Sequence, residues 1–420
     1  MAKVQDGYTL YGRRWIVLIA FICCNVVQIY VWTTFSSVVT DAWRFYGFSD
    51  AASGEFAMSA VTLVFMIGMI TLSVPASAVF AKLGWYKTVS TAAIVVMLFT
   101  LLRGFVGDTY VGMMVCACGV SAMQPFMINA FGMIAANWFP PSERGIANGL
   151  GMVSTYIGVA MVQFGVPWLM STFGMDIPHV LKVLGFAAIP LSLFIVFAGK
   201  EKPPTPPCDE ELVERIDWKS GMKSLIRNKQ FILALLIFWF MQGIYFVFST
   251  LIEPILQYLN NDSLDSMFIG TLGTIMTVFA TAATLILPIM ADKSKTKKRL
   301  PMVRVCEIGA LVGLVLFFAG HGIGMLIVAA AFMGVFLMGI TPVLLVLGYE
   351  TAYPVSEGIT ESLMQLGANG FGMILLLFIN AVFRGQHGGT MLFLSAAMAV
   401  AVVMAFFIRE RSAKERLLEK

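Results

Sequence analysis

The stretch GYETAYPVSEG, residues 348–358, and the earlier stretch NWFPPSERG, residues 137–145, share one pattern. Each contains an aromatic residue, a proline, one further residue and then Ser-Glu. In both cases a glycine follows the glutamate of the motif by 15 residues. A pattern that returns in order at the same spacing indicates an internal duplication.

The composition around these stretches is that of a membrane protein. Of the 420 residues, 59% are hydrophobic and 12% are charged, whereas about a quarter of a soluble domain is charged. An apolar run of about 18 or more residues is long enough to cross a bilayer as a helix. The sequence predicts an all-α protein with twelve transmembrane helices, at 15–40, 52–80, 88–107, 109–137, 144–172, 178–199, 229–259, 266–291, 301–320, 322–348, 357–383 and 389–409.

The predicted helices fall into two halves that resemble each other. Trp32 lies three residues before a Phe-Ser-Ser run in the first helix, and Tyr245 lies three residues before a Phe-Ser-Thr run in the seventh. A Pro-rich polar segment, which cannot span a membrane, separates the halves at residues 200–207. We therefore expect two pseudo-symmetric six-helix bundles, residues 1–199 and 229–420, joined by a cytoplasmic linker, 200–228, that contains an amphipathic helix.

The distribution of Lys and Arg predicts the orientation. If both termini are cytoplasmic, the cytoplasmic segments hold 24 of the 28 Lys and Arg residues, which is a strong positive-inside bias. The net charge of +4 is explained by this topology, so a nucleic-acid partner is not needed. We expect a multi-pass monomer in the lipid bilayer of the plasma membrane, or of the inner membrane in a bacterium.

Two parallel repeats of six helices are the architecture of major facilitator transporters, in which the halves rock about a site near the bilayer midplane. The sequence resembles that superfamily over its whole length. Within it, the chain is most similar to the feline leukaemia virus subgroup C receptor-related transporters, the haem and choline group. Four stretches carry this resemblance: Arg13-Arg14-Trp15 leading to Trp32, Gln124 with Ala136-Asn137-Trp138-Phe139, Tyr245 with Ser249-Thr250-Leu251, and Tyr353-Pro354-Val355-Ser356-Glu357-Gly358.

The resemblance implies facilitated movement of a choline-like solute, with Trp32 and Tyr245 around a quaternary ammonium. The sequence departs from the family pattern where Tyr156 and Asn369 stand in place of two glutamines. The basic loop after the second helix also lacks the acidic residue usual in the superfamily, whereas the copy after the eighth helix has Asp292.

Polar side chains in the predicted helices supply the candidate binding site, because polar groups in a bilayer rarely face lipid. The candidate substrate-binding residues are Asn25, Gln28, Trp32, Gln124, Asn129, Tyr156, Gln242, Tyr245, Gln365 and Asn369. A row of threonines in the eighth helix is also polar, but a threonine in a helix often bonds its own backbone. Trp and Tyr also mark the headgroup belt, although Trp32 and Tyr245 lie well inside their predicted helices.

Five further residues are candidates for gating or coupling, namely Glu253, Asp292, Glu143, Arg144 and Glu357. Glu253 is the best placed to bind a proton or to attract cations from the outside. Glu143, Arg144 and Glu357 are expected to form ion pairs at an inner gate, and Asp292 to stabilise one conformation. An alternative is that Ser142 and Ser356 cap helices, with the glutamates in the first turn.

These residues favour a secondary transporter that works by alternating access. The first interpretation is a uniporter of a choline-like cation or zwitterion; the second is a proton-coupled carrier of another metabolite or drug; the third is a non-transporting sensor. An organic anion would need a buried arginine, for which Arg103 is the only candidate. No enzyme constellation, cofactor or metal site is expected, and Cys116 and Cys118 fit small buried hydrophobes better than a metal pair.

Overall fold

The computed structural model describes residues 2–5, 8–205, 224–260, 264–293, 298–320, 322–352, 355 and 357–409. The chain divides into two compact units, Met1–Leu212 and Val213–Lys420, and each is described by itself. Within the described residues, twelve helices are long and apolar enough to cross a membrane. The all-α membrane fold with twelve spans is therefore confirmed. Most of the expected amphipathic linker helix lies at 206–223, outside the described residues.

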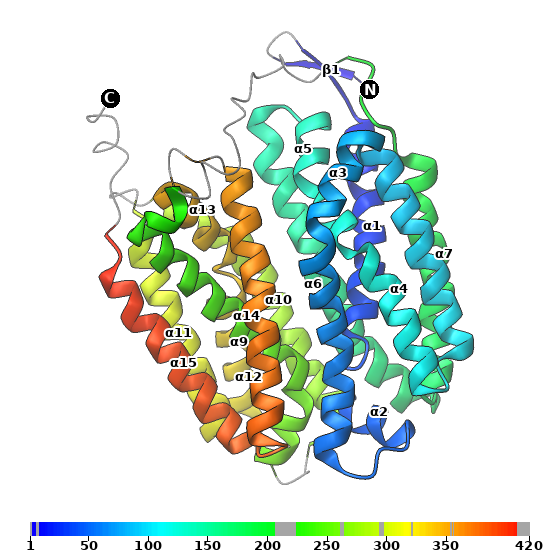
Figure 1. Cartoon of the computed structure of the whole chain (residues 1–420), viewed down its shortest axis with the longest axis vertical. Coiled ribbons are helices and arrows are strands. Elements are labelled where there is room, and N and C mark those ends of the chain that lie inside the picture. The colour runs from blue at the N-terminus through cyan, green and yellow to red at the C-terminus, as the bar shows by residue number, and fades with distance from the viewer. Residues whose placement is uncertain are drawn as a thin grey trace. The chain divides into compact units, whose positions relative to one another are not determined.

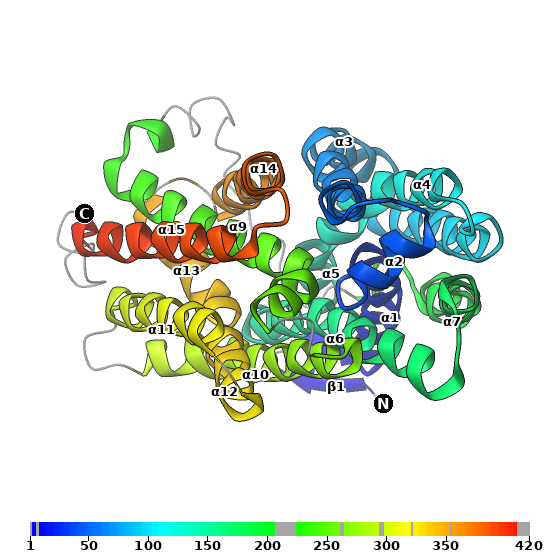
Figure 2. The same cartoon turned by 90° about the horizontal axis from the view of Figure 1, so that it is seen from below.

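The first unit begins with a hairpin and continues with helices. Strands β1 (Ala2–Gln5) and β2 (Tyr8–Tyr11) pair antiparallel, with Ala2 opposite Tyr11. The helices run side by side in Figure 1, and α1 lies between α6 and α7 in Figure 2. They are α1 (Arg13–Thr33), α2 (Val39–Phe45), α3 (Ala51–Val106), α4 (Tyr110–Ile128), α5 (Ala130–Trp138), α6 (Pro141–Phe173) and α7 (Ile177–Ala198).

Helix α1 is shorter than predicted. The expected helix over 15–40 ends at Thr33, and a turn leads into the short helix α2. The hydroxyls of Thr33 and Thr34 donate to the carbonyls of Ile29 and Tyr30, 2.9 and 2.7 Å away. Such side-chain bonds compete with the helical backbone pattern, and they occur where α1 stops.

Helix α3 contains two predicted spans and bends sharply between them. Gly84 has φ +77° and ψ 170°, a backbone conformation that residues with a Cβ atom rarely adopt. The two membrane-crossing parts are Ala51–Ser73 and Lys82–Val106. The predicted separation of the two spans is thus correct, with a kinked turn as the connection. The span predicted at 109–137 is interrupted at Asn129, where α4 ends and α5 begins.

The second unit is built around α9, which packs against α14 and α15 (Figure 2). Its helices are α9 (Lys229–Leu259), α10 (Ser266–Asp292), α11 (Leu300–Ala319), α12 (Ile323–Phe332), the π-helix η1 (Met333–Met338), α13 (Thr341–Ala352), α14 (Glu357–Phe383) and α15 (His387–Phe407).

Two helices of this unit are distorted. Helix α9 is non-helical at Leu251, three residues before Pro254, which has no amide hydrogen to donate. The span predicted at 322–348 consists of α12, η1 and α13 in succession. In η1 the amide of Gly339 donates to the carbonyl of Gly334 at 3.0 Å, the wider i to i+5 spacing of a π-helix.

Candidate functional site

A polar face of α1 carries three of the candidate residues. Asn25, Gln28 and Trp32 follow one another at helical spacing of three and four, so they share one side of the helix. The Asn25 amide donates to the Ser154 hydroxyl of α6 at 2.8 Å. Gln28 is fully buried, and neither of its amide atoms has a hydrogen-bond partner within the described residues. Buried polar groups are normally satisfied, so the unpartnered Gln28 amide is an unusual feature of this face, one turn from Trp32.

Trp32 presents a half-buried aromatic ring. It stacks on Phe65 of α3, with 6.1 Å between ring centroids and 18° between planes. Phe65 is fully buried and therefore fixes one face of the Trp32 ring. A fixed indole is the best of the aromatic side chains for binding a cation.

The other candidates of the first unit lie on α4 and α6. Gln124 is buried and its amide oxygen has no partner within the described residues. Asn129 occupies the break between α4 and α5, where its backbone amide donates to the Pro125 carbonyl at 3.1 Å. Tyr156 is half-buried on α6, two residues after Ser154. Gln124 thus adds an unsatisfied amide oxygen, whereas Asn129 has a local role in the helix break.

In the second unit, α9 carries two of the candidates. Thr341 of α13 donates a long hydrogen bond, 3.4 Å, to the side-chain oxygen of Gln242. Tyr245 is half-buried, and its ring lies 5.6 Å from that of Phe246. Tyr245 and Gln242 are one turn apart, so both side chains lie on one face of α9.

Helix α14 approaches α9 very closely near the last two candidates. A Cβ atom on Gly367 would lie 2.0 Å from the Trp239 ring, and the Trp239 indole donates to the Met364 carbonyl at 3.2 Å. Asn369 donates to the carbonyl of Gln365, one turn earlier in its own helix, at 2.9 Å. The amide nitrogen of Asn369 is therefore engaged locally.

The threonine row of α10 is used for packing. The hydroxyls of Thr274, Thr277 and Thr281 each donate to the carbonyl four residues earlier, at 2.8 to 2.9 Å. This is the local backbone bonding described above, and it leaves no hydroxyl hydrogen of these three for a solute.

The gating candidates make partly different contacts from those expected. Glu143 pairs with Arg14 of α1, whose Nη2 lies 3.0 and 3.1 Å from its two carboxylate oxygens. Helix α6 begins at Pro141 after Pro140, with Glu143 in its first turn. The expectation that Ser142 is the N-cap is therefore wrong, because Pro140 occupies that position.

The remaining gating candidates divide between described and undescribed side chains. Asp292 and Glu357 stand at the end of α10 and the start of α14, and Arg144 lies in the first turn of α6. The side chains of these three, and residue Ser356, lie outside the described part of the chain. Glu253 is fully buried next to Pro254.

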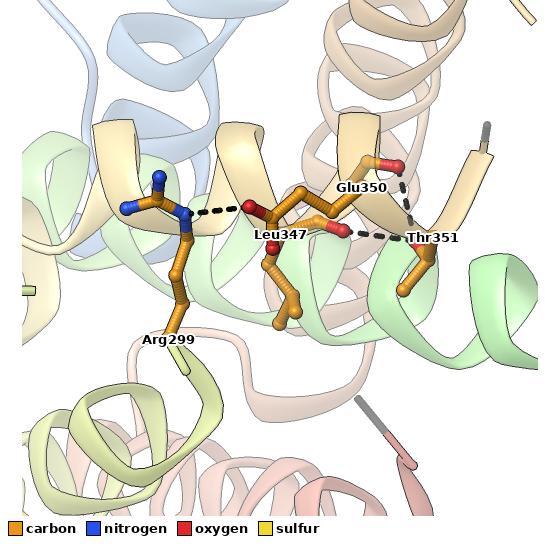
Figure 3. Close-up of polar contacts among 5 residues, drawn as sticks. Arg299, Leu347, Glu350 and Thr351 are labelled. Carbon is orange, nitrogen blue, oxygen red and sulfur yellow. Dashed lines mark hydrogen bonds and ion pairs between the residues drawn. The ribbon is translucent and has the colours of Figure 1, made fainter. Parts of the chain in front are cut away.

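A second ion pair lies at the end of α13, in the stretch that opened the sequence analysis. Arg299 Nε lies 3.3 Å from Glu350 Oε1, and Figure 3 shows the two side chains pointing toward each other. Thr351 donates to the Leu347 carbonyl at 2.9 Å, and its own carbonyl accepts from Asn228 at 2.7 Å. The Arg299–Glu350 pair thus ties the start of α11 to the end of α13.

Three charged residues have contacts or surroundings that only the structure shows. Glu307 of α11 is fully buried, and neither carboxylate oxygen has a partner within the described residues. Arg103 of α3 is 2% exposed and bonds the end of α1. The Glu201 carboxylate accepts from the Trp85 and Tyr86 amides, at 3.1 and 2.8 Å. Spacing along the sequence gives no signal for these contacts, although a carboxylate in an apolar span was a signal for Glu307.

Outside the membrane spans, the surroundings of three side chains shift their pKa values. Burial raises the pKa of Tyr46 to about 12. Hydrogen bonds from Ser53 lower the pKa of Asp50, which caps α3. Hydrogen bonds from His179 lower the pKa of Asp176, which caps α7. Both aspartates are therefore anionic helix caps at neutral pH.

The described residues hold no group of three or more His, Cys, Asp or Glu side chains arranged for a metal ion. Cys116 is buried, whereas Cys118 is exposed, so the expectation that both are small buried hydrophobes is wrong for Cys118.

A family comparison decides the identity of the fold. Residues 17–375 match the family described as Major Facilitator Superfamily. The chain belongs to the major facilitator superfamily. It is a membrane transporter, and its relatives are transporters and not enzymes.

Named relatives of this superfamily member lie in the group that the sequence motifs resemble. The choline/ethanolamine transporter flvcr2a of Danio rerio is 23% identical over 95% of this chain and 87% of its own length. The choline/ethanolamine transporter FLVCR2 of Homo sapiens is 24% identical over 97% of this chain and 80% of its own. The resemblance to the feline leukaemia virus subgroup C receptor-related transporters is thus confirmed.

Solved structures of other superfamily members share the fold. A bacterial homologue of the human lysosomal transporter Spinster, inward-facing and unoccupied, matches with a TM-score of 0.67 and 15% identity over 94% of this chain and 95% of its own. The Escherichia coli fucose:proton symporter FucP matches with a TM-score of 0.62 and 13% identity over 94% of this chain and 98% of its own.

Proposed function

We propose that this major facilitator is a facilitative uniporter of a choline-like cation or zwitterion. The observation that carries the proposal is the polar and aromatic face of α1. There the Trp32 ring is braced by Phe65, and the buried Gln28 amide lacks a partner within the described residues. An aromatic ring binds a quaternary ammonium through its face, and an amide supplies a hydrogen bond to a hydroxyl or carboxylate. The names of the relatives support the same substrate class.

The second unit carries a similar pair of side chains, Tyr245 and Gln242. A tyrosine ring and a primary amide on one face of α9 repeat the chemistry of Trp32 and Gln28 on α1. A ring face against a desolvated cation contributes about 2 kcal/mol or more.

Proton-coupled transport is the second candidate, and the buried carboxyl groups favour it. Glu307 is fully buried without a partner within the described residues, and Glu253 is fully buried beside the kink of α9. A buried carboxyl that changes its proton occupancy is a common coupling device in carriers. In this candidate, acid outside stimulates uptake, and Glu253→Gln or Glu307→Gln removes the stimulation.

The deciding experiment is uptake of radiolabelled choline into proteoliposomes, with ethanolamine and betaine as competitors. We expect Trp32→Ala to weaken choline affinity about 30-fold, the factor that corresponds to ~2 kcal/mol. Trp168→Ala is the matched control, because Trp168 is an exposed ring on α6 that packs on Phe173. Equal loss in both variants, or choline uptake that is indifferent to Trp32, contradicts the proposed site.

The same vesicles separate the two candidates. A uniporter of a cation responds to membrane potential and is indifferent to an imposed pH gradient. A proton-coupled carrier accumulates solute when only the pH gradient is imposed. Protease access to the two termini tests the proposed orientation, in which both face the cytoplasm.

A further inference from the structure

The end of α1 next to Trp32 is stabilised by side chains. The last four carbonyls of a helix have no amide partner within the helix, and in α1 these are the carbonyls of residues 30–33. The Thr34 hydroxyl donates to the Tyr30 carbonyl at 2.7 Å. Arg103 Nη1 donates to the Val31 carbonyl at 3.2 Å and to the Thr34 hydroxyl oxygen at 3.0 Å. Arg103 is therefore bonded to the backbone immediately before Trp32, at Val31, and to the side chain of Thr34 after it.

Arg103 reaches this helix end from α3. Its guanidinium carbon also lies 5.0 Å from the centroid of the Phe35 ring, within the range of a cation–π contact. A cation at the C-terminus of a helix is favourable, because the last carbonyls carry partial negative charge. The two hydrogen bonds and the ring contact of Arg103 thus go to Val31, immediately before Trp32, and to Thr34 and Phe35 after it.

The burial of Arg103 is costly, and the contacts do not satisfy it fully. The side chain is 2% exposed, and Nε and Nη2 have no hydrogen-bond partner within the described residues. A buried charge without a counter-charge is rare unless it has a specific role. The role that its contacts indicate is to fix the last turn of α1.

Trp32 is therefore held at two points. Phe65 supports the face of the ring, and Arg103 bonds the Val31 carbonyl before Trp32 and the Thr34 hydroxyl after it. We propose that Arg103 is a positioning residue for Trp32, and that it tunes affinity for a quaternary ammonium without touching it. This inference rests on the proposed function in taking Trp32 as the cation-binding ring.

The direction in which KM for choline changes separates a positioning role of Arg103 from a purely electrostatic one. Arg103 is a cation in the same unit as the proposed cation site, so loss of its charge alone should strengthen binding of choline. Loss of a positioning contact should weaken it. The variant Arg103→Met removes charge and contacts together, so the direction of the change in KM tells which effect dominates.

The experiment measures choline uptake in proteoliposomes for wild type, Arg103→Met and Arg103→Lys, normalised to the amount of reconstituted protein. We expect KM to rise about tenfold in Arg103→Met, with Vmax within about twofold. The KM of Arg103→Lys should lie between those of wild type and Arg103→Met, because a lysine keeps the charge but lacks the planar guanidinium that bonds two acceptors. An unchanged or lower KM in Arg103→Met overturns the inference.

Arg44→Met is the control. Arg44 is an exposed arginine of α2 in the first unit, and its guanidinium carbon lies 5.3 Å from the centroid of the Trp43 ring. Its removal changes the net charge equally, so its KM should stay within about twofold of wild type. An equal rise of KM in both arginine variants assigns the effect to general loss of structure and overturns the inference.

Hydrogen exchange separates this inference from the proposed function. Backbone amides of residues 30–38 should exchange faster in Arg103→Met than in wild type, whatever the substrate. If wild type transports no choline but exchange increases, the proposed function fails and the positioning contact stands. If exchange at 30–38 is unchanged, Arg103 does not hold this helix end.

Discussion

Glu201 supplies the structure's most specific stability prediction. Its two carboxylate oxygens accept from the Trp85 and Tyr86 amides, at 3.1 and 2.8 Å, where α3 resumes after the kink at Gly84. The Trp85 indole donates to the Glu201 carbonyl at 2.7 Å. One acidic residue thus caps the start of a membrane span and fixes the segment that follows α7.

The magnitude follows from these bonds. A hydrogen bond to a charged group contributes about 1.5–3 kcal/mol, and loss of an N-cap typically costs about 1 kcal/mol. Glu201 is half-buried, so screening by water reduces the larger figure. We expect Glu201→Ala to destabilise the first unit by about 2 kcal/mol, which lowers Tm by roughly 4–8 °C for a unit of this size.

The assay is thermal unfolding of the purified protein, followed by tryptophan fluorescence. Glu201→Gln retains one acceptor oxygen and should lose about half as much. Lys202→Ala is the control, since the neighbouring Lys202 is exposed. A Tm for Glu201→Ala within about 1 °C of wild type would refute the capping role.

Gly84 gives an independent check on the same contact. A Cβ atom at this position would lie 2.6 Å from the Glu201 carboxylate, and φ is +77°. Gly84→Ala should therefore destabilise the wild type for two reasons, the steric overlap and the backbone strain. In the Glu201→Ala variant the steric overlap is gone and only the backbone strain at residue 84 remains. Gly84→Ala should therefore lower the free energy of unfolding less in that variant than in wild type. Equal losses in the two backgrounds would contradict the contact between Gly84 and Glu201.

Three further outcomes follow from single contacts. Asn25→Ala removes the hydrogen bond between α1 and α6 and should cost about 1–2 kcal/mol, measured by thermal unfolding. Glu350→Gln breaks the pair with Arg299 and should cost about 1 kcal/mol in the same assay, an effect that salt should reduce. Hydrogen bonds from His179 lower the pKa of Asp176 in the folded state. The charged cap therefore stabilises the folded protein at pH values above the ordinary aspartate pKa of about 3.9. This stabilisation is lost as the pH falls through the lower pKa of the folded state. The Tm difference between wild type and Asp176→Ala should accordingly shrink as the pH falls below about 3.9, and a difference that is the same at all pH values would count against the charged cap.

The sequence predicted the spans well because each span must satisfy a simple physical demand. Roughly 20 apolar residues are needed to cross a bilayer, and hydropathy reports that directly. It does not report where a helix stops within an apolar run. Val38 and Val39 continue the apolar run of the first span, but α1 ends at Thr33, where Thr33 and Thr34 bond the backbone.

The polar residues of the candidate site were predictable because they interrupt the apolar spans, whereas their hydrogen-bond and ion-pair partners were not predictable. A glutamine in an apolar helix such as Gln28 stands out in any sequence, because its burial is expensive. The partner of Glu143 could not be predicted this way. The adjacent Arg144 was the obvious choice, but the structure pairs Glu143 with Arg14, 129 residues away. Helix α1 brings Arg14 beside the start of α6, and only the packing of the two helices shows it.

The repeated stretch that revealed the two halves shows what a duplication does and does not determine. In the first copy, the glutamate of the Ser-Glu motif, Glu143, forms the ion pair with Arg14. In the second, the described ion pair uses Glu350, seven residues before the equivalent Glu357, and its partner Arg299 comes from the start of α11. The duplication therefore predicts that charged pairs lie at matching loops, but each unit places its charges according to its own helix packing. Variants at Glu143 and at Glu350, which each break a described ion pair, are therefore the comparison that the structure supports.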